Sequence, residues 1–173
     1  FAATDATSGM TGGLAATQYS TDDGVTWATG TSVTVKGDLQ GGTDGEHPIL
    51  YRSIDAAGNV EAPQAINVKI DTRAPSTVAS AVVTATRGTT VSLPYRVNDP
   101  LPTCGTATAW IVIRDENDRV MATLPKVVVA VNQPQTQTYL CTLKPGNYRY
   151  WVKAVDAAGN QELSSGGNKL IVK

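Results

Sequence analysis

The chain has 173 residues, a formal net charge of −1 and a charged share of 17%, and it is rich in Thr, Val, Ala and Gly. Ordinary globular proteins carry roughly 25% charged residues, and this composition favours strands over helices. The balanced charge predicts neither nucleic-acid binding nor a polybasic membrane patch, and no apolar run reaches the ~20 residues that span a bilayer. We therefore expect an all-β chain that neither binds nucleic acid nor inserts into a membrane.

The first predicted domain covers residues 1–71 and closes with a strand, a turn and a second strand. Residues 47–53 alternate as a half-buried strand does, and the face expected to point inward carries His47, Ile49, Tyr51 and Ser53. The pentapeptide Asp-Ala-Ala-Gly-Asn follows at 55–59. Its carboxylate can accept nearby backbone N–H groups, and Gly and Asn tolerate positive φ. We therefore expect a hairpin turn that leads into a strand at 65–70.

Residues 72–75 are predicted to form a short, semi-rigid linker, because Pro75 restrains Ala74 to extended geometry. The second predicted domain, 76–173, has enough strand candidates for a β-sandwich. They lie at 77–84, 90–97, 107–113, 119–124, 126–131, 137–143, 148–155 and 169–172. In the strand at 148–155 the face expected to point inward carries Tyr148, Tyr150, Val152 and Ala154.

An internal repeat relates the two domains. The pentapeptide recurs at 156–160, which is 101 residues after its first copy. At the same offset Gly45, His47, Arg52 and Glu61 match Gly146, Tyr148, Lys153 and Glu162. A match in register over a whole strand-turn-strand unit indicates domain duplication.

A second match concerns the beginning of the chain. Residues 1–5 (Phe-Ala-Ala-Thr-Asp) are similar to 95–99 (Tyr-Arg-Val-Asn-Asp), and position 95 lies in the middle of a predicted strand. By this match the first domain lacks the counterpart of 76–94, which holds the first strand and half of the second. An open sandwich of this kind exposes an edge to which another chain could donate a strand.

The segments 5–9, 18–27, 51–61 and 70–75 together resemble a bacterial Ig-like repeat of secreted and cell-wall proteins. Segment 143–150 and the second pentapeptide resemble a bacterial Ig-like or fibronectin-type-III-like domain, and 111–124 is similar to the Ig-like domain of flagellar-hook capping proteins. The resemblance implies two immunoglobulin-like β-sandwiches in tandem, the first without its N-terminal strand region. It also implies a secreted, extracellular or cell-surface location and no catalytic residues.

Cys104 and Cys141 are the only cysteines. An even pair in a small β-rich chain predicts a disulfide formed in an oxidising compartment, with two free buried thiols as the alternative. The positions are not those of an antibody-type bridge, because Cys104 precedes the predicted third strand and Cys141 precedes the Pro-Gly turn.

Carboxylates and amides recur at the loop ends. The first copy has Asp55, Asn59, Glu61 and Asp71, and the second has Asp156, Asn160 and Glu162. Oxygen ligands of this kind suit calcium. Their spacing matches no calcium loop, so we favour turn chemistry without a cofactor and keep calcium as the alternative. The acidic run at 115–118 is interpreted as a hairpin tip.

The aromatic residues offer a binding hypothesis. Trp110 and Trp151 fall on strands that are neighbours in an Ig sandwich, and an exposed pair could stack on a carbohydrate or anchor a protein. Covered by a loop or by the other domain, they would be core residues. Trp27 is expected to cap the first core, and His47 to bond a backbone group at a strand corner, as Tyr148 would.

The inventory disfavours catalysis, since His47 is the only histidine and no phosphate loop, zinc spacing or nucleophile motif is present. Three functions remain. The chain is predicted to be a structural, spacer or adhesion module whose partners are other domains of a parent protein or neighbouring subunits. The alternatives are a fibre subunit that accepts a donated strand, and a carbohydrate-binding accessory module of a secreted enzyme.

Overall fold

The computed structural model describes residues 2–4, 9, 16–37, 42–162 and 164–173. The chain divides between Ile70 and Asp71 into two compact units, which we call unit 1 and unit 2. The segment predicted as a linker at 72–75 therefore lies within unit 2. Across these residues, no helix is both long enough and apolar enough to cross a membrane.

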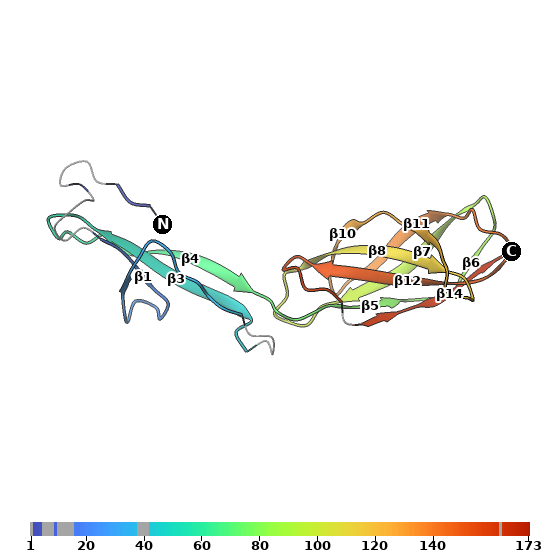
Figure 1. The fold of residues 1–173 in the computed structure, drawn as a ribbon, viewed down its shortest axis with the longest axis horizontal. Helices are drawn as coiled ribbons and strands as arrows, with labels where there is room; N and C mark the ends of the chain where they lie inside the picture. The colour runs from blue at the N-terminus through green and yellow to red at the C-terminus, as the bar shows by residue number, and fades with distance from the viewer. Residues whose placement is uncertain (1, 5–8, 10–15, 38–41, 163) are drawn as a thin grey trace. The chain divides into compact units, whose positions relative to one another are not determined.

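Unit 1 contains a four-stranded antiparallel sheet in the order β2-β1-β3-β4, and Figure 1 labels β1, β3 and β4. Its strands are β1 (Ala16–Ser20), β2 (Ala28–Thr29), β3 (Gly45–Ile54) and β4 (Gln64–Ile70). On the predicted inward face of β3, Ile49 is buried and the other three side chains are at least partly exposed. Phe1 and Asp5, on which the match to 95–99 depends, lie outside the described residues, so the missing strand region stays a prediction.

Unit 2 is a β-sandwich of two sheets (Figure 1). One sheet has the order β11-β7-β5-β13, and the other has the order β10-β8-β12-β14-β6 with β9 paired to β8. This arrangement places the first, second and fifth strands of an Ig domain opposite the third, sixth and seventh. The strands of the first sheet are β5 (Ser76–Ala79), β7 (Thr90–Asn98), β11 (Pro134–Leu140) and β13 (Ser164–Gly166). Those of the second are β6 (Val83–Ala85), β8 (Thr106–Arg114), β9 (Val120–Thr123), β10 (Val127–Ala130), β12 (Gly146–Asp156) and β14 (Asn168–Val172).

The core of unit 2 lies between the two sheets. The predicted inward face of β12 is confirmed, because Tyr150, Val152 and Ala154 are at most 1% exposed. Fully burying a side chain of valine size contributes about 1.5–3 kcal/mol to folding. The Tyr150 hydroxyl donates to the carbonyls of Ala81 and Pro94 at 2.7 and 3.0 Å, which links β12 to the opposite sheet. The all-β prediction is thus confirmed, and unit 2 is an Ig-like sandwich as predicted.

Two strand predictions need correction. The single strand expected at 77–84 is two strands, β5 and β6, which belong to different sheets. The chain crosses between the sheets at Ser80, Ala81 and Val82, which are exposed and could not continue a buried strand. Strand β13 was not predicted, since its sequence Ser-Ser-Gly resembles a loop.

The strand-turn-strand repeat is confirmed in the backbone. Strands β3 and β12 begin at the matched glycines, and the turns close on the matched bridges Ile54↔Val60 and Val155↔Gln161. The two corner residues make the same bond: His47 Nε2 lies 2.6 Å from the carbonyl of Thr43, and the Tyr148 hydroxyl donates to that of Lys144 at 3.0 Å.

The predicted disulfide is wrong, since Cys104 and Cys141 are free thiols. Cys141 bonds the backbone of Thr89, just before β7 begins. Cys104 lies beyond the other end of β7, where its N–H donates to Asp71. Nine residues of strand separate the two ends, which corresponds to ~30 Å at ~3.3 Å per residue. A disulfide needs Cα atoms within ~7 Å.

Candidate functional site

Three buried carboxylates meet at one end of unit 2, and we call them the carboxylate cluster: Asp71, Asp99 and Asp156. One oxygen of each lies within 4.8 Å of the others, and the residues are 8%, 3% and 5% exposed. They come from three separate segments. Asp71 is the first residue of unit 2, Asp99 directly follows β7, and Asp156 ends β12.

Asp156 is held by the second pentapeptide turn. Its Oδ1 accepts the backbone N–H of Asn160 at 2.8 Å, and its Oδ2 accepts the Asn160 side-chain amide at 2.8 Å. The same amide donates to the main-chain carbonyl of Asp71 at 2.9 Å. Asn160 therefore connects two members of the cluster.

Asp71 accepts backbone donors on both oxygens, from Arg73 N–H at 3.1 Å and from Cys104 N–H at 3.0 Å. The neighbouring thiol responds to this environment. Burial, a hydrogen bond to Asp71 and the negative charges of the cluster raise the pKa of Cys104 to about 11. The thiol therefore stays protonated at neutral pH and is a poor nucleophile.

Asp99 is positioned by its backbone. Its N–H donates to Asn132 Oδ1 at 2.9 Å, and its carbonyl accepts the Asn132 amide at 2.8 Å. Oδ2 accepts the hydroxyl of Thr103, whereas Oδ1 is buried and has no hydrogen-bond partner in the described part of the chain. Burial raises the pKa of Asp99, the hydrogen bond from Thr103 opposes this, and the charges of Asp71 and Asp156 raise it further.

The structure brings together only part of the predicted oxygen set. Asp71, Asp156 and Asn160 meet, but Glu162 does not join them. Its Oε1 lies 2.9 Å from Lys153 Nζ, an ion pair without hydrogen-bond geometry, and its Oε2 accepts the Thr77 hydroxyl at 2.8 Å. Sequence reasoning missed Asp99, which is considered there only within the match of 95–99 to 1–5. Its alignment with Asp5 was the one available signal.

The oxygens of unit 1 form turn hydrogen bonds. Asp55 Oδ1 accepts the N–H groups of Ala57 and Asn59 at 2.9 and 2.8 Å, and its Oδ2 accepts the Asn59 amide at 2.7 Å. Glu61 accepts the N–H of Ser53 at 3.1 Å and the amide of Gln64 at 2.7 Å. Turn chemistry accounts for each of these bonds.

The predicted tryptophan pair lies on the outer face of the β8–β12 sheet. Trp110 pairs with Lys153, and Trp151 with Val112, so both rings share that face. Each is half-buried and covered in part. Lys126 Nζ lies 4.6 Å from the Trp110 centroid, and a Cβ at Gly167 would lie 2.6 Å from the Trp151 ring.

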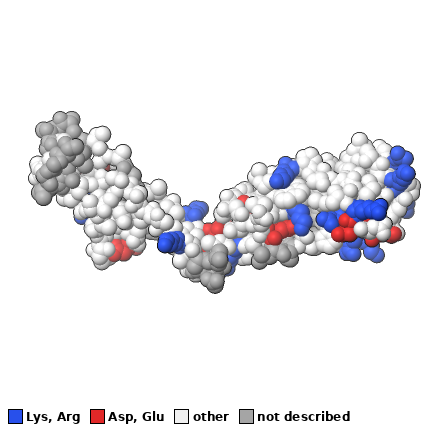
Figure 2. All heavy atoms as spheres, in the orientation of Figure 1, with Lys and Arg blue, Asp and Glu red and all other residues white. Residues whose placement is uncertain are grey.

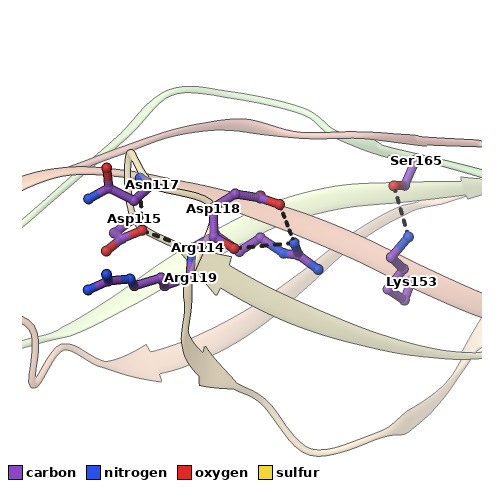
Figure 3. Close-up of polar contacts among 7 residues, drawn as sticks. All are labelled: Arg114, Asp115, Asn117, Asp118, Arg119, Lys153 and Ser165. Carbon is purple, nitrogen blue, oxygen red and sulfur yellow. Dashed lines mark hydrogen bonds and ion pairs between the residues drawn. The ribbon is translucent and has the colours of Figure 1, made fainter.

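A groove of about 550 Å³ runs beside Trp151, and its lining includes Arg114, Asp115, Tyr148 and Arg149. Basic and acidic side chains both gather toward the C-terminal end of unit 2 (Figure 2). Arg114 Nη1 lies 2.7 Å from Asp118 Oδ2, and Asp115 Oδ1 accepts the N–H groups of Asn117 and Arg119 at 2.9 Å. Figure 3 shows these contacts as dashed lines. The acidic run at 115–118 is therefore a hairpin tip, as predicted.

Trp27 belongs to unit 1 and directly precedes β2. Its Nε1 donates to the carbonyl of Gly24 at 3.1 Å, and the Arg52 guanidinium lies 3.8 Å from its ring centroid. Lys153 of unit 2 is the residue that matches Arg52 in the repeat. Its Nζ donates to the hydroxyl of Ser165 at 3.2 Å (Figure 3).

No protein-family model and no curated protein sequence matches this chain. Among solved structures, one similar chain is a tetra-tandem repeat in the extending region of a large adhesion protein, at 18% identity over 94% of this chain, with a TM-score of 0.44. The present chain spans 42% of that chain's length. A CARDB domain from Pyrococcus furiosus, solved with di-metal ions, matches 57% of this chain and 89% of its own length at 9% identity and a TM-score of 0.36. The FN1–FN3 domains of chicken CNTN1 match 91% of this chain and 57% of their own length at 14% identity and a TM-score of 0.29.

Proposed function

We propose that the chain is a non-catalytic spacer or adhesion segment of a secreted or cell-surface protein, built to carry tension along its length. The observation that carries the proposal is the position of the chain where it enters and leaves unit 2. Asp71 lies near Asp156 at the end of β12, to which Asn160 links it, whereas Val172 pairs with Gly146 at the beginning of that strand. The eleven residues of β12 separate these points by ~35 Å.

In unit 1 the chain also runs from one end of the sheet to the other. The N–H of Ala56, beyond the end of β3, donates to the carbonyl of Gly9 at 3.2 Å. The last residue of β4, Ile70, pairs with Gly45 at the beginning of β3. In each unit the chain thus passes from one end of the sheet to the other, as a spacer requires.

The terminal strands of unit 2 pair in parallel, which favours resistance to pulling. Strand β14 pairs with β6 through Leu170↔Val83, Ile171↔Thr84 and Val172↔Ala85, and β13 pairs with β5. The Lys173 N–H extends the first ladder to the Ala85 carbonyl at 2.9 Å. Tension applied at opposite ends of parallel neighbours shears all of their hydrogen bonds at once instead of breaking them one by one.

Single-molecule pulling tests this proposal. In one geometry the force acts through the two ends of the chain. In the control geometry one handle is inserted in the exposed turn at Arg87, and the other stays at Lys173, so both lie beyond the same end of the β6–β14 ladder. We expect unit 2 to unfold at a clearly higher force in the first geometry. Equal forces in both would contradict a tension-bearing role.

Carbohydrate binding is the second candidate, and the groove beside Trp151 and Tyr148 supports it. Aromatic faces beside charged side chains can hold a sugar ring and its hydroxyls. On a glycan array, Trp151→Ala would abolish a signal from this groove, while Trp27→Ala in unit 1 would leave it unchanged. A signal that survives Trp110→Ala and Trp151→Ala together would exclude this candidate.

Strand donation between subunits is supported by one feature of unit 1. Strand β4 lies at the edge of its sheet, and Ile66, which pairs with the buried Ile49, is 45% exposed. A strand from another chain could pair there. Concentration-dependent fibre growth that stops with Ile66→Lys would support this candidate, and a chain that stays monomeric at high concentration would exclude it.

A further inference from the structure

The carboxylate cluster concentrates negative charge in a buried place. Asp71, Asp99 and Asp156 each offer an oxygen within 4.8 Å of the others. No lysine or arginine in the part of the chain that the structure describes forms an ion pair with any of the three. Like charges at this separation repel, and burial removes the water that would screen them. The cluster therefore lacks a positively charged partner among the described side chains.

Asp99 gives an independent indication of what that partner is. Asp99 is 3% exposed, and its carboxylate faces the other two. Of the six carboxylate oxygens, five accept a hydrogen bond, and Asp99 Oδ1 accepts none within the described residues. A buried carboxylate oxygen without a donor costs folding free energy unless something else contacts it.

We propose that the cluster binds one calcium ion, with an oxygen each from Asp71, Asp99 and Asp156. Calcium binds oxygen ligands at about 2.3–2.6 Å, so any two of them lie within about 5 Å of each other, which agrees with the cluster. Calcium also accepts irregular geometry, whereas magnesium needs a small regular octahedron. Water completes the shell. Backbone and amide donors to the carboxylates of Asp71 and Asp156 orient these ligands, as neighbours of metal ligands do.

The site goes beyond the spacer function and does not depend on it. Asp71 directly follows Ile70, the last residue of β4. An ion bound to Asp71, Asp99 and Asp156 would fix the point where the chain enters unit 2 to the ends of β7 and β12. Calcium would then stabilise unit 2 by mass action.

Calcium titration of the full chain, stripped with chelator, tests the site. We expect one ion per chain in isothermal titration, with a dissociation constant of roughly 10⁻⁴–10⁻³ M, as in extracellular modules. Calcium should also raise the melting temperature of unit 2, and magnesium at the same concentration should do so much less. Absence of binding at ten times this concentration range would overturn the proposal, and equal binding of magnesium would overturn the assignment to calcium.

Asp99→Asn separates a calcium site from its rival, a protonated Asp99 that needs no ion. Asparagine keeps an acceptor for Thr103 and removes one negative charge, so without calcium the variant should be at least as stable as the parent chain. Its calcium affinity should fall at least tenfold, the effect of losing one charged ligand (~1.4 kcal/mol). Asp55→Asn, at the position of the first copy that matches Asp156, is the control and should keep full affinity. Asp99→Asn with unchanged calcium binding would overturn the proposal.

Discussion

The two Asp-Ala-Ala-Gly-Asn turns share one backbone and differ in their surroundings. In both, the aspartate N–H bonds the carbonyl of the asparagine, at 3.0 Å in unit 1 and 3.1 Å in unit 2. In both, the asparagine amide donates to the aspartate carboxylate. Both carboxylates also accept the N–H of the asparagine, and Asp55 accepts that of Ala57 as well. Asp156 in addition lies beside Asp71 and Asp99. A motif can thus determine a turn without determining the chemistry around it.

The difference comes from residues outside the repeat. Asp71 arrives from the connection between the units, and Asp99 arrives from the end of β7 in the opposite sheet. Both reach Asp156 because the strands of a sandwich end together on one side. In unit 1 the position matched to Asp99 is Asp5, which lies outside the described residues. The comparison can therefore be tested best at Asp156, Asn160 and Glu162 against their matched partners.

Replacing the two turn asparagines by alanine should show the largest contrast. Asn160→Ala removes an amide that bonds a buried carboxylate and the carbonyl of Asp71, and bonds to charged groups contribute about 1.5–3 kcal/mol. Asn59→Ala removes one bond at an exposed turn, which should cost less than about 1 kcal/mol.

Native-state hydrogen exchange measures both costs, because it reports the stability of each unit separately. The experiment is done in chelator, so that calcium plays no part in it. Equal losses of stability in the two variants would mean that the surroundings of Asn160 add nothing to the stability of its turn, and would contradict the expected difference between the two turns.

The matched glutamates should show a smaller contrast. Glu162 is 8% exposed in its side chain, pairs with Lys153 and accepts the Thr77 hydroxyl. Glu162→Gln keeps an acceptor for Thr77 but loses the ion pair, and since Lys153 is 38% exposed we expect a cost of about 1 kcal/mol. Glu61→Gln, at an exposed position, should change the unfolding free energy of unit 1 by less than about 0.5 kcal/mol. Hydrogen exchange again reads each unit, and a larger loss for Glu61→Gln would contradict the burial argument.

Local patterns in the sequence predicted much of this fold. The alternation at 148–155 predicted that Tyr150, Val152 and Ala154 face the core, because side chains alternate between the faces of a strand. The offset of the repeat matched His47 to Tyr148, and both residues bond a carbonyl four residues earlier. These features depend on neighbours along the chain, which the sequence displays directly.

Features that depend on sheet order could not be predicted in this way. The prediction of a Cys104–Cys141 disulfide followed from an even count of cysteines. In the fold the two residues lie near opposite ends of β7. Asp99, in the sequence Asn-Asp-Pro, is indistinguishable from a turn residue until β7 and β12 are placed to end on the same side. The strand at 77–84 was split for a similar reason, since crossing from one sheet to the other leaves no periodic signal.

At Asp22 the effect of hydrogen bonds on the carboxyl pKa can be separated from the effect of burial. Its pKa can then be compared with that of a buried carboxylate. Asp22 is exposed in unit 1. Hydrogen bonds from the Thr26 side chain and N–H, and from Ser20, lower its pKa to about 2. Burial and like charges do the opposite at Asp99, whose pKa is raised. Polar donors alone thus favour the charged carboxylate, whereas a buried cluster disfavours it.

The expected pH dependence of unit 1 follows from the sign of this shift. Because the folded pKa of Asp22 lies below its ordinary value of 3.8, its hydrogen bonds stabilise the turn fully above pH 3.8 and are lost as the pH falls toward 2. An NMR titration of the Asp22 carboxyl and the Thr26 amide measures this directly. Thr26→Val removes the largest cause and should move the midpoint up toward 3.8, while the turn N–H bond remains. A midpoint near 3.8 in the parent chain would show that hydrogen bonds in an exposed turn do not stabilise the charged form of Asp22.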